Sequence, residues 1–272
     1  MQPLKFFLGI GLAIVLVFTA ASAYSHFAKV TSPAPGTDRE TLYQVSTIDA
    51  LMQGAFDGTE TIRDLRTHGD FGIGTFNGLD GEMTVLDGVV YQAKADGKIY
   101  RVADNITTPF ATVTYFDRDL AVKTDQSMNL TTFTTVMAGK LPSRNIEYAV
   151  RIHGTFPSMQ VRAVPVQHPP YPTLTEAIKK QAVFTYTNTT GTIVGFYTPD
   201  LFRGLNVAGF HLHFISDDRQ EGGHILDCII PENTTVEYDI TPGFAMELPT
   251  NGTFTNVDLS RNLTSDLEKV EK

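Results

Sequence analysis

Residues 209–230 read GFHLHFISDDRQEGGHILDCII, and this stretch carries the sharpest pattern in the chain. Two apolar, β-type runs flank a polar, glycine-containing stretch from residue 217 to 223, where the chain can turn back. Side chains two apart on a strand point to the same face, so His211 and His213 project together. The returning strand begins at His224, which can place a third imidazole beside the first two. Three convergent imidazoles favour a divalent ion, zinc first, with positions left open for water or substrate.

The rest of the chain predicts an α+β fold with mostly mixed or antiparallel sheet and few helices. Residues 82–86 and 89–93 are strand-like and flank Asp87-Gly88, which predicts a β-hairpin. One amphipathic helix is expected after Ser46-Thr47, ending before Gly58, with an apolar stripe at Ile48, Leu51, Met52 and Ala55. A second is expected to open at Thr173-Leu174-Thr175-Glu176, which has capping-box spacing, and to bury Ala177, Ile178, Ala182 and Val183.

Length, charge and cysteine content narrow the possible classes of protein. The 272 residues can form one large domain or two small ones. The net charge of −9 disfavours nucleic acid as a partner, because an acidic surface repels phosphate backbones. A single cysteine, Cys228, excludes an intrachain disulfide and a cysteine zinc cluster. Its apolar neighbours predict a buried strand residue with an unreactive thiol.

The N-terminus is typical of an exported protein. Lys5 precedes an uncharged stretch from residue 6 to 23, which ends in Ala21-Ser22-Ala23. A basic start, an apolar middle and small residues at this spacing predict a signal peptide over residues 1–23, and residues 24–40 then form a flexible lead-in. The expected location is secreted or at the cell surface, without membrane contact after cleavage. An uncleaved N-terminal anchor is the alternative.

Asparagine usage agrees with export. Six of the ten asparagines begin an Asn-x-Thr sequon without proline, at Asn105, Asn129, Asn188, Asn233, Asn251 and Asn262. Such sites predict a glycoprotein with these positions at its surface, provided that the host has the machinery. A threonine-rich composition without modification is the alternative.

Several separate stretches resemble one known family. Residues 209–227 look like the metal signature of the acetolactate decarboxylase family. Residues 68–83 resemble its N-terminal block, and residues 161–171 resemble its arginine block. The similarity covers roughly residues 45–272 in order and without large gaps, which makes it more specific than one matching motif.

The resemblance implies a fold, an activity and a set of site residues. The implied fold is a mixed-sheet N-terminal region (residues 41–168) and a smaller β-rich C-terminal region (169–272) that carries the metal, usually as a homodimer. A boundary near Pro169 also suits the run of prolines there. The implied reaction is the decarboxylation of 2-acetolactate to acetoin and carbon dioxide. The implied zinc ligands are His211, His213 and His224, and the implied catalytic residues are Glu82, Arg162, Thr75 and a tail glutamate, Glu271, with Glu268 in reserve.

These residue types suit the chemistry, although alternatives remain open. A planar guanidinium such as Arg162 can hold a carboxylate in a bidentate fork, and glutamates can carry protons or bind metal. Without the resemblance, Glu82 would be a surface carboxylate of the hairpin and Arg162 a solvated strand residue. A cupin-like metal-dependent dioxygenase is one alternative function, although cupins place the Glu and the third His at other spacings. A non-catalytic exported surface protein is the other, but it leaves the histidine cluster unexplained.

Overall fold

The structure is a computed structural model that describes residues 38–271, all within one compact unit. The expected signal peptide and most of the lead-in therefore lie outside the described residues. Between residues 38 and 271, no helix is both long and apolar enough to cross a membrane.

The first of two large sheets is mixed. Its order is β16-β1-β8-β3-β4-β5-β6, and β1 and β16 are its one parallel pair. The strands are β1 (Thr41–Val45), β3 (Phe71–Thr75), β4 (Glu82–Leu86), β5 (Val89–Ala93), β6 (Ile99–Arg101), β8 (Ala111–Thr114) and β16 (Gly243–Glu247).

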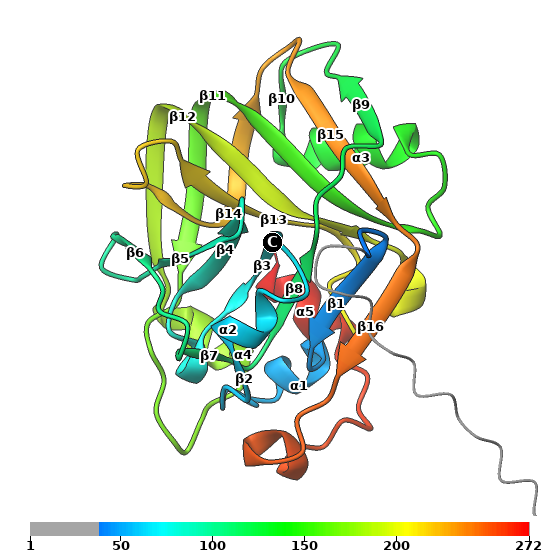
Figure 1. Cartoon of the computed structure of the whole chain (residues 1–272). Coiled ribbons are helices and arrows are strands. Elements are labelled where there is room, and N and C mark those ends of the chain that lie inside the picture. The colour runs from blue at the N-terminus through cyan, green and yellow to red at the C-terminus, as the bar shows by residue number, and fades with distance from the viewer. Residues whose placement is uncertain (1–37, 272) are drawn as a thin grey trace, which may run out of the picture. The chain divides into compact units, whose positions relative to one another are not determined.

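The second large sheet is antiparallel and has the order β10-β14-β13-β12-β11-β15-β9. Its strands are β9 (Leu120–Lys123), β10 (Met128–Asn129), β11 (Glu147–Ala163), β12 (Ala182–Thr198), β13 (Gly209–Ser216), β14 (Gly222–Ile230) and β15 (Thr235–Thr241). Because β14 also pairs with β11, strands β11 to β14 close on themselves. This closure brings the end of β11 beside the start of β14 (Figure 1).

The remaining elements are short. A two-stranded sheet joins β2 (Glu60–Thr61) to β7 (Thr107–Thr108). The α-helices are α1 (Ile48–Met52), α2 (Ile62–Leu65), α3 (Leu130–Lys140), α4 (Leu174–Ala177) and α5 (Thr264–Val270). Single 3-10 turns occupy Asn77–Leu79, Ile178–Lys180, Asp200–Phe202 and Gly252–Asn256.

The two large sheets pack face to face. One buried cluster takes Leu42, Phe71 and Ile73 from the first sheet and Val194 and Phe196 from the second. A separate cluster fills the interior of the closed strands and includes Cys228, which is 1% exposed, as predicted. Burial raises the pKa of this thiol to about 12, so the cysteine is unreactive at neutral pH.

Two local predictions from the sequence are confirmed, namely the turn of one hairpin and the N-cap of one helix. The hairpin β4–β5 turns at Asp87 and Gly88, which both have positive φ (51° and 73°). This is the combination that a two-residue hairpin loop with an Asp-Gly sequence favours. Helix α1 begins after Thr47, whose side chain accepts a hydrogen bond from the amide of Ala50. Its predicted end before Gly58 is wrong, because the helix ends at Met52 and the chain turns at Gly54, which has a φ of +86°.

The second predicted helix is wrong in its last part. It does begin after Thr173, but the predicted capping box is not formed, since the side chain of the N-cap residue Thr173 makes no capping hydrogen bond to the helix backbone. Its α-helical turn ends at Ala177, and β12 already includes Ala182 and Val183. Val183 is 47% exposed and pairs with Arg162 in the ladder between β11 and β12, so it does not form the buried helical face that its spacing predicts. The ladder with the long strand β11 therefore outweighs the local helical spacing.

The strands before and after the proline run share one sheet. β11 and β12 pair from Tyr148–Tyr197 to Ala163–Ala182, and Pro169 lies in the connection between them. In the first sheet, β16 from the far end of the chain pairs with β1. Both large sheets therefore draw strands from both sides of residue 169, and the division at that residue stays a prediction.

A buried carboxyl on β11 predicts how stability depends on pH. Burial raises the pKa of Glu147 to about 7, and the Thr198 hydroxyl offsets this only partly. The folded protein thus binds this proton more tightly than the unfolded chain does. The resulting stability is present at low pH and is lost as the pH rises from about 4.5 to about 7.

Replacing Glu147 by Gln should remove that part of the pH dependence. We expect the decrease in the free energy of unfolding between pH 4.5 and 8 to be smaller than in the parent by roughly 3 kcal/mol. Denaturant melts at the two pH values measure this. Glu176→Gln, on the exposed face of α4, is the matched control and should leave the difference unchanged. An unaltered pH dependence in Glu147→Gln would show that this carboxyl is ionised in the folded protein.

Candidate metal centre

The three histidines of the H-x-H stretch and its return strand meet at the pairing of β13 with β14. His213 lies directly opposite His224 in the antiparallel register. His211 lies two residues before His213, on the same face of β13. The three ring centroids are 5.0 to 5.3 Å apart. One ligand nitrogen from each ring can be chosen so that all three lie within 4.8 Å of one another.

A glycine lets β14 approach β11 closely beside His224. Gly223 has a φ of +144°, and an added Cβ would lie 2.5 Å from the carbonyl oxygen of Arg162. Only glycine fits this position without moving the backbone of β11. The close approach places Arg162 opposite His224 in the ladder between the two strands.

The tautomer of His213 follows from its hydrogen bond. Its Nδ1 lies 2.7 Å from the backbone carbonyl oxygen of Met83, which can only accept, so Nδ1 carries the proton. The lone pair is therefore on Nε2, which is buried and has no hydrogen-bond partner among the described residues. A buried acceptor without a partner is costly unless a ligand satisfies it. This atom fits a metal ion, and the Met83 carbonyl is the outer contact that orients such a ligand.

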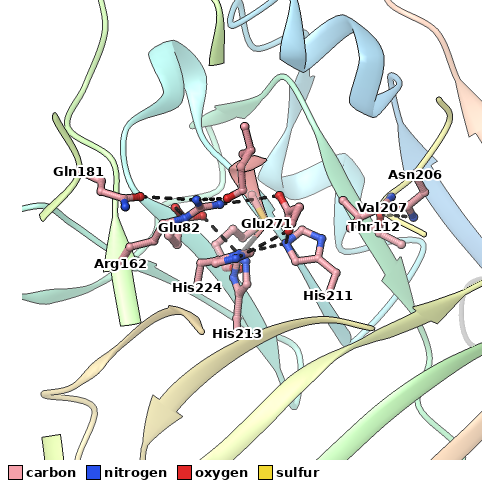
Figure 2. A network of polar contacts seen from close by, with 12 residues as sticks. Glu82, Thr112, Arg162, Gln181, Asn206, Val207, His211, His213, His224 and Glu271 are labelled. Atoms are coloured by element: carbon pink, nitrogen blue, oxygen red, sulfur yellow. Dashed lines mark hydrogen bonds and ion pairs between the residues drawn. The ribbon is translucent and has the colours of Figure 1, made fainter. Parts of the chain in front are cut away.

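Two glutamates flank the histidines (Figure 2). Glu82, at the start of β4, has Oε2 3.8 Å from Nε2 of His213. Glu271 directly follows α5, and its Oε2 lies 3.8 Å from Nε2 of His211 and 3.6 Å from Nε2 of His224. The cluster thus offers three nitrogen donors and two carboxylates around one point.

Arg162 lies between the two glutamates, with one edge engaged and one edge open. Its Nη1 donates to the backbone carbonyl of Val270 and, at 3.4 Å, to Oε1 of Gln181. Its Nη2 is 3.7 Å from Glu271, and its Nε is 4.0 Å from Glu82. Nε is also buried and without a hydrogen-bond partner in the described part of the chain. The edge formed by Nε and Nη2 is therefore available to a carboxylate.

Burial determines the protonation of the cluster. It lowers the pKa of His211 to about 3, with a further contribution from the charge of Arg162. Burial likewise holds the pKa values of His213 and His224 well below the ordinary range. All three imidazoles are thus neutral at physiological pH, which is the form that binds metal. Burial also raises the pKa of Glu82 to about 7, against the effect of Arg162, and raises the pKa of Glu271.

The structure brings all seven predicted site residues together in the lining of one pocket. Thr75 faces Glu82 across β3 and β4, and its hydroxyl donates to the Gly81 carbonyl at 2.7 Å. Glu271 lines the pocket, whereas Glu268, the alternative tail residue, is not among the lining residues.

Sequence reasoning missed the apolar wall of the pocket. Six side chains form it, namely Ile48, Leu51, Leu79, Phe110, Val164 and Leu174. An apolar stripe such as that on residues 48–55 predicts core packing, and no local pattern shows that a core helix also faces a site. Gln181, which contacts Arg162, carried no sequence signal.

Comparisons with known proteins agree on one group. A sequence model described as "Alpha-acetolactate decarboxylase" matches residues 42–261. A protein of that name from Methanosarcina mazei is 52% identical over 86% of this chain and 81% of its own length. The protein of that name from Bacillus subtilis strain 168 is 40% identical, over 85% of this chain and 90% of its own length.

Solved structures agree as well. The crystal structure of alpha-acetolactate decarboxylase from Bacillus subtilis strain 168 superposes with a TM-score of 0.82 at 40% identity. The match covers 85% of this chain and 99% of that one. A Staphylococcus aureus protein, described as of unknown function and similar to alpha-acetolactate decarboxylase, gives a TM-score of 0.79 at 34% identity.

Proposed function

Because the chain belongs to the alpha-acetolactate decarboxylase family and is an enzyme of that activity, we propose that its decarboxylation of 2-acetolactate depends on zinc held by His211, His213 and His224. The observation that carries this proposal is the buried Nε2 of His213, which lacks a partner among the described residues and points to the other two imidazoles. Three neutral imidazoles, with carboxylates beside them and room for further ligands, are a donor set that suits zinc. Neither alternative from the sequence, the cupin-like dioxygenase or the non-catalytic surface protein, accounts for the family match.

Bound there, such an ion would supply a Lewis acid for the oxygen on which charge develops. The protein's own contribution begins with Arg162, whose open edge can hold the substrate carboxylate at two oxygens. The apolar wall, which includes Leu51 and Leu174, would receive the methyl groups and exclude water.

The two glutamates are the proposed proton carriers. Glu82 and Glu271 approach Arg162 and the histidines through different atoms, so either can return a proton to the carbon that loses carbon dioxide. Thr75 has its hydroxyl engaged with the Gly81 carbonyl, so we assign it to holding the start of β4, and with it Glu82, in place.

The decisive measurement is acetoin formation from 2-acetolactate by the purified protein, with and without a chelator. We expect the activity to be lost with the metal and to return when zinc is added back. If acetoin formed at the original rate after complete removal of metal, zinc dependence would be wrong even though the decarboxylase activity stood.

We also propose that the protein is exported, cleaved after Ala23 and glycosylated. The support is the basic and apolar N-terminal pattern, together with the exposure of all six sequon asparagines. Even Asn188, in the middle of β12, has a φ of +51° where the pairing is interrupted opposite Pro157. The Asn side chain is thus presented at an irregularity of the strand and not inside a regular ladder.

Mass spectrometry of the protein from its natural host tests both parts. The expected N-terminus is Tyr24, with added mass on one or more of the six sequons. Asn77, which is exposed but lacks a sequon, is the control residue. An intact Met1 would refute cleavage, an intact Met1 on a cytoplasmic protein would refute export as well, and six bare asparagines would refute glycosylation. The family resemblance further suggests a homodimer, which a one-chain mass in sedimentation equilibrium would contradict.

A further inference from the structure

Glu271 differs from the other site residues in the element that positions it. Thr75, Glu82, Arg162 and the three histidines lie on strands, whose ladders fix their backbones. Glu271 instead follows α5, a helix of seven residues without a side-chain hydrogen bond at its N-cap. Helices this short are unstable without tertiary contacts. The position of the Glu271 carboxylate must therefore come from the docking of α5 on the rest of the protein.

Val270 makes the contacts that dock this segment. Its side chain is fully buried in a cluster with Ile48, Leu51 and Leu174, which also line the pocket. Its backbone carbonyl accepts the hydrogen bond from Nη1 of Arg162. One residue thus contacts the apolar wall through its side chain and the guanidinium through its backbone. The next residue, Glu271, places a carboxylate 3.6 Å from His224 and 3.7 Å from Arg162.

We propose that Val270 is a positioning residue. Its side chain packs against the apolar wall, and this packing holds Glu271 and Arg162 in the arrangement that catalysis requires. This proposal rests on the site roles given above for those two residues. The side chain of Val270 fixes the last turn of α5 and thereby the direction in which Glu271 leaves the helix. The carbonyl engages Nη1, which turns the Nε and Nη2 edge of Arg162 toward the pocket. The apolar wall and the polar site are thus coupled through one residue of the tail.

The test uses full-length variants of the metal-loaded enzyme. Val270→Ala removes the wall contact but keeps the carbonyl, and Val270→Ile keeps a branched aliphatic side chain. Lys269→Ala is the matched control, because Lys269 is 70% exposed and its ion pair, with Asp266, lies within the helix. Glu271→Gln tests the role of the carboxylate separately. The measurements are kcat, KM, zinc content, melting temperature and amide hydrogen exchange over residues 264–271.

We expect Val270→Ala to lower kcat/KM about 10- to 100-fold, mostly through kcat, because a small displacement of catalytic groups is costly. Zinc content and melting temperature should stay near those of the parent, and exchange should accelerate over residues 264–271. The kcat/KM values of Val270→Ile and Lys269→Ala should stay within about threefold of the parent value, since neither substitution removes the contact of residue 270 with the apolar wall.

The possible failures are distinguishable. If Glu271→Gln is impaired but Val270→Ala is normal, the positioning role is wrong and the role of Glu271 stands. If Val270→Ala loses activity only in proportion to a fall in melting temperature, Val270 is a packing residue and the proposal is again wrong. Normal kinetics in Glu271→Gln would overturn both the proposed role of Glu271 and this inference.

Discussion

The His213→Ala variant should lose its metal, and its activity should fall at least about 1000-fold. The reason is that a Lewis acid stabilises the transition state by several kcal/mol. His213 is the most buried of the three imidazoles, at 1% exposure, and its tautomer is fixed by the Met83 carbonyl. Alanine leaves no donor in its place, and water would have to fill a buried site. Zinc content after extensive dialysis and acetoin formation should therefore fall together.

His153→Ala is the matched control for this experiment. His153 is exposed on β11 and contacts Asp217 at 3.2 Å, away from the lining of the pocket. Its loss should change neither zinc content nor rate. A full equivalent of zinc in dialysed His213→Ala would refute the ligand assignment, and a normal rate without zinc would refute the role of the metal.

Arg162→Lys should lower kcat/KM by roughly 100-fold, or about 3 kcal/mol, while zinc content stays unchanged. The guanidinium uses Nη1 to bind the Val270 carbonyl and offers a second edge, Nε with Nη2, to the substrate. A lysine ammonium keeps the charge but has no planar second edge, so it cannot make both sets of contacts in fixed directions. Kinetics, zinc content and melting temperature on this one variant check the prediction.

Arg151→Lys provides the comparison for Arg162→Lys. Arg151 also lies on β11, but it forms a half-buried ion pair with Glu237 at 2.7 Å, outside the pocket lining. The same substitution there should leave the reaction unaffected. Near-normal kinetics in Arg162→Lys would remove Arg162 from the catalytic residues and weaken the role assigned to Glu82, which rests on the same resemblance.

Helix α3 illustrates why some elements could not be predicted. Its sequence, LTTFTTVMAGK, is rich in threonine, which favours strands, and only Phe133 and Met137 are buried. The N-cap is Asn129, whose side chain accepts a hydrogen bond from the amide of Thr132. In the sequence this residue stands out only as the first residue of an Asn-x-Thr sequon. Packing of Phe133 against the closed strands, and not an amphipathic stripe, stabilises this helix.

The sequence by itself determined the arrangement of the three histidines, because alternation along a strand and a short return are local properties of the backbone. It also determined the hairpin β4–β5, since Asp87-Gly88 suits the positive φ values of that turn. The resemblance to a family added Glu82, Arg162, Thr75 and Glu271, for which the residues alone indicated nothing. Only the tertiary structure decided how these residues meet the histidines. The pairing of Arg162 with His224 depends on the closure of β14 against β11, and Glu271 depends on the docking of α5. Both are contacts between segments that are distant in the sequence. They depend on how the sheets and the helix pack as a whole, which no local sequence pattern indicates.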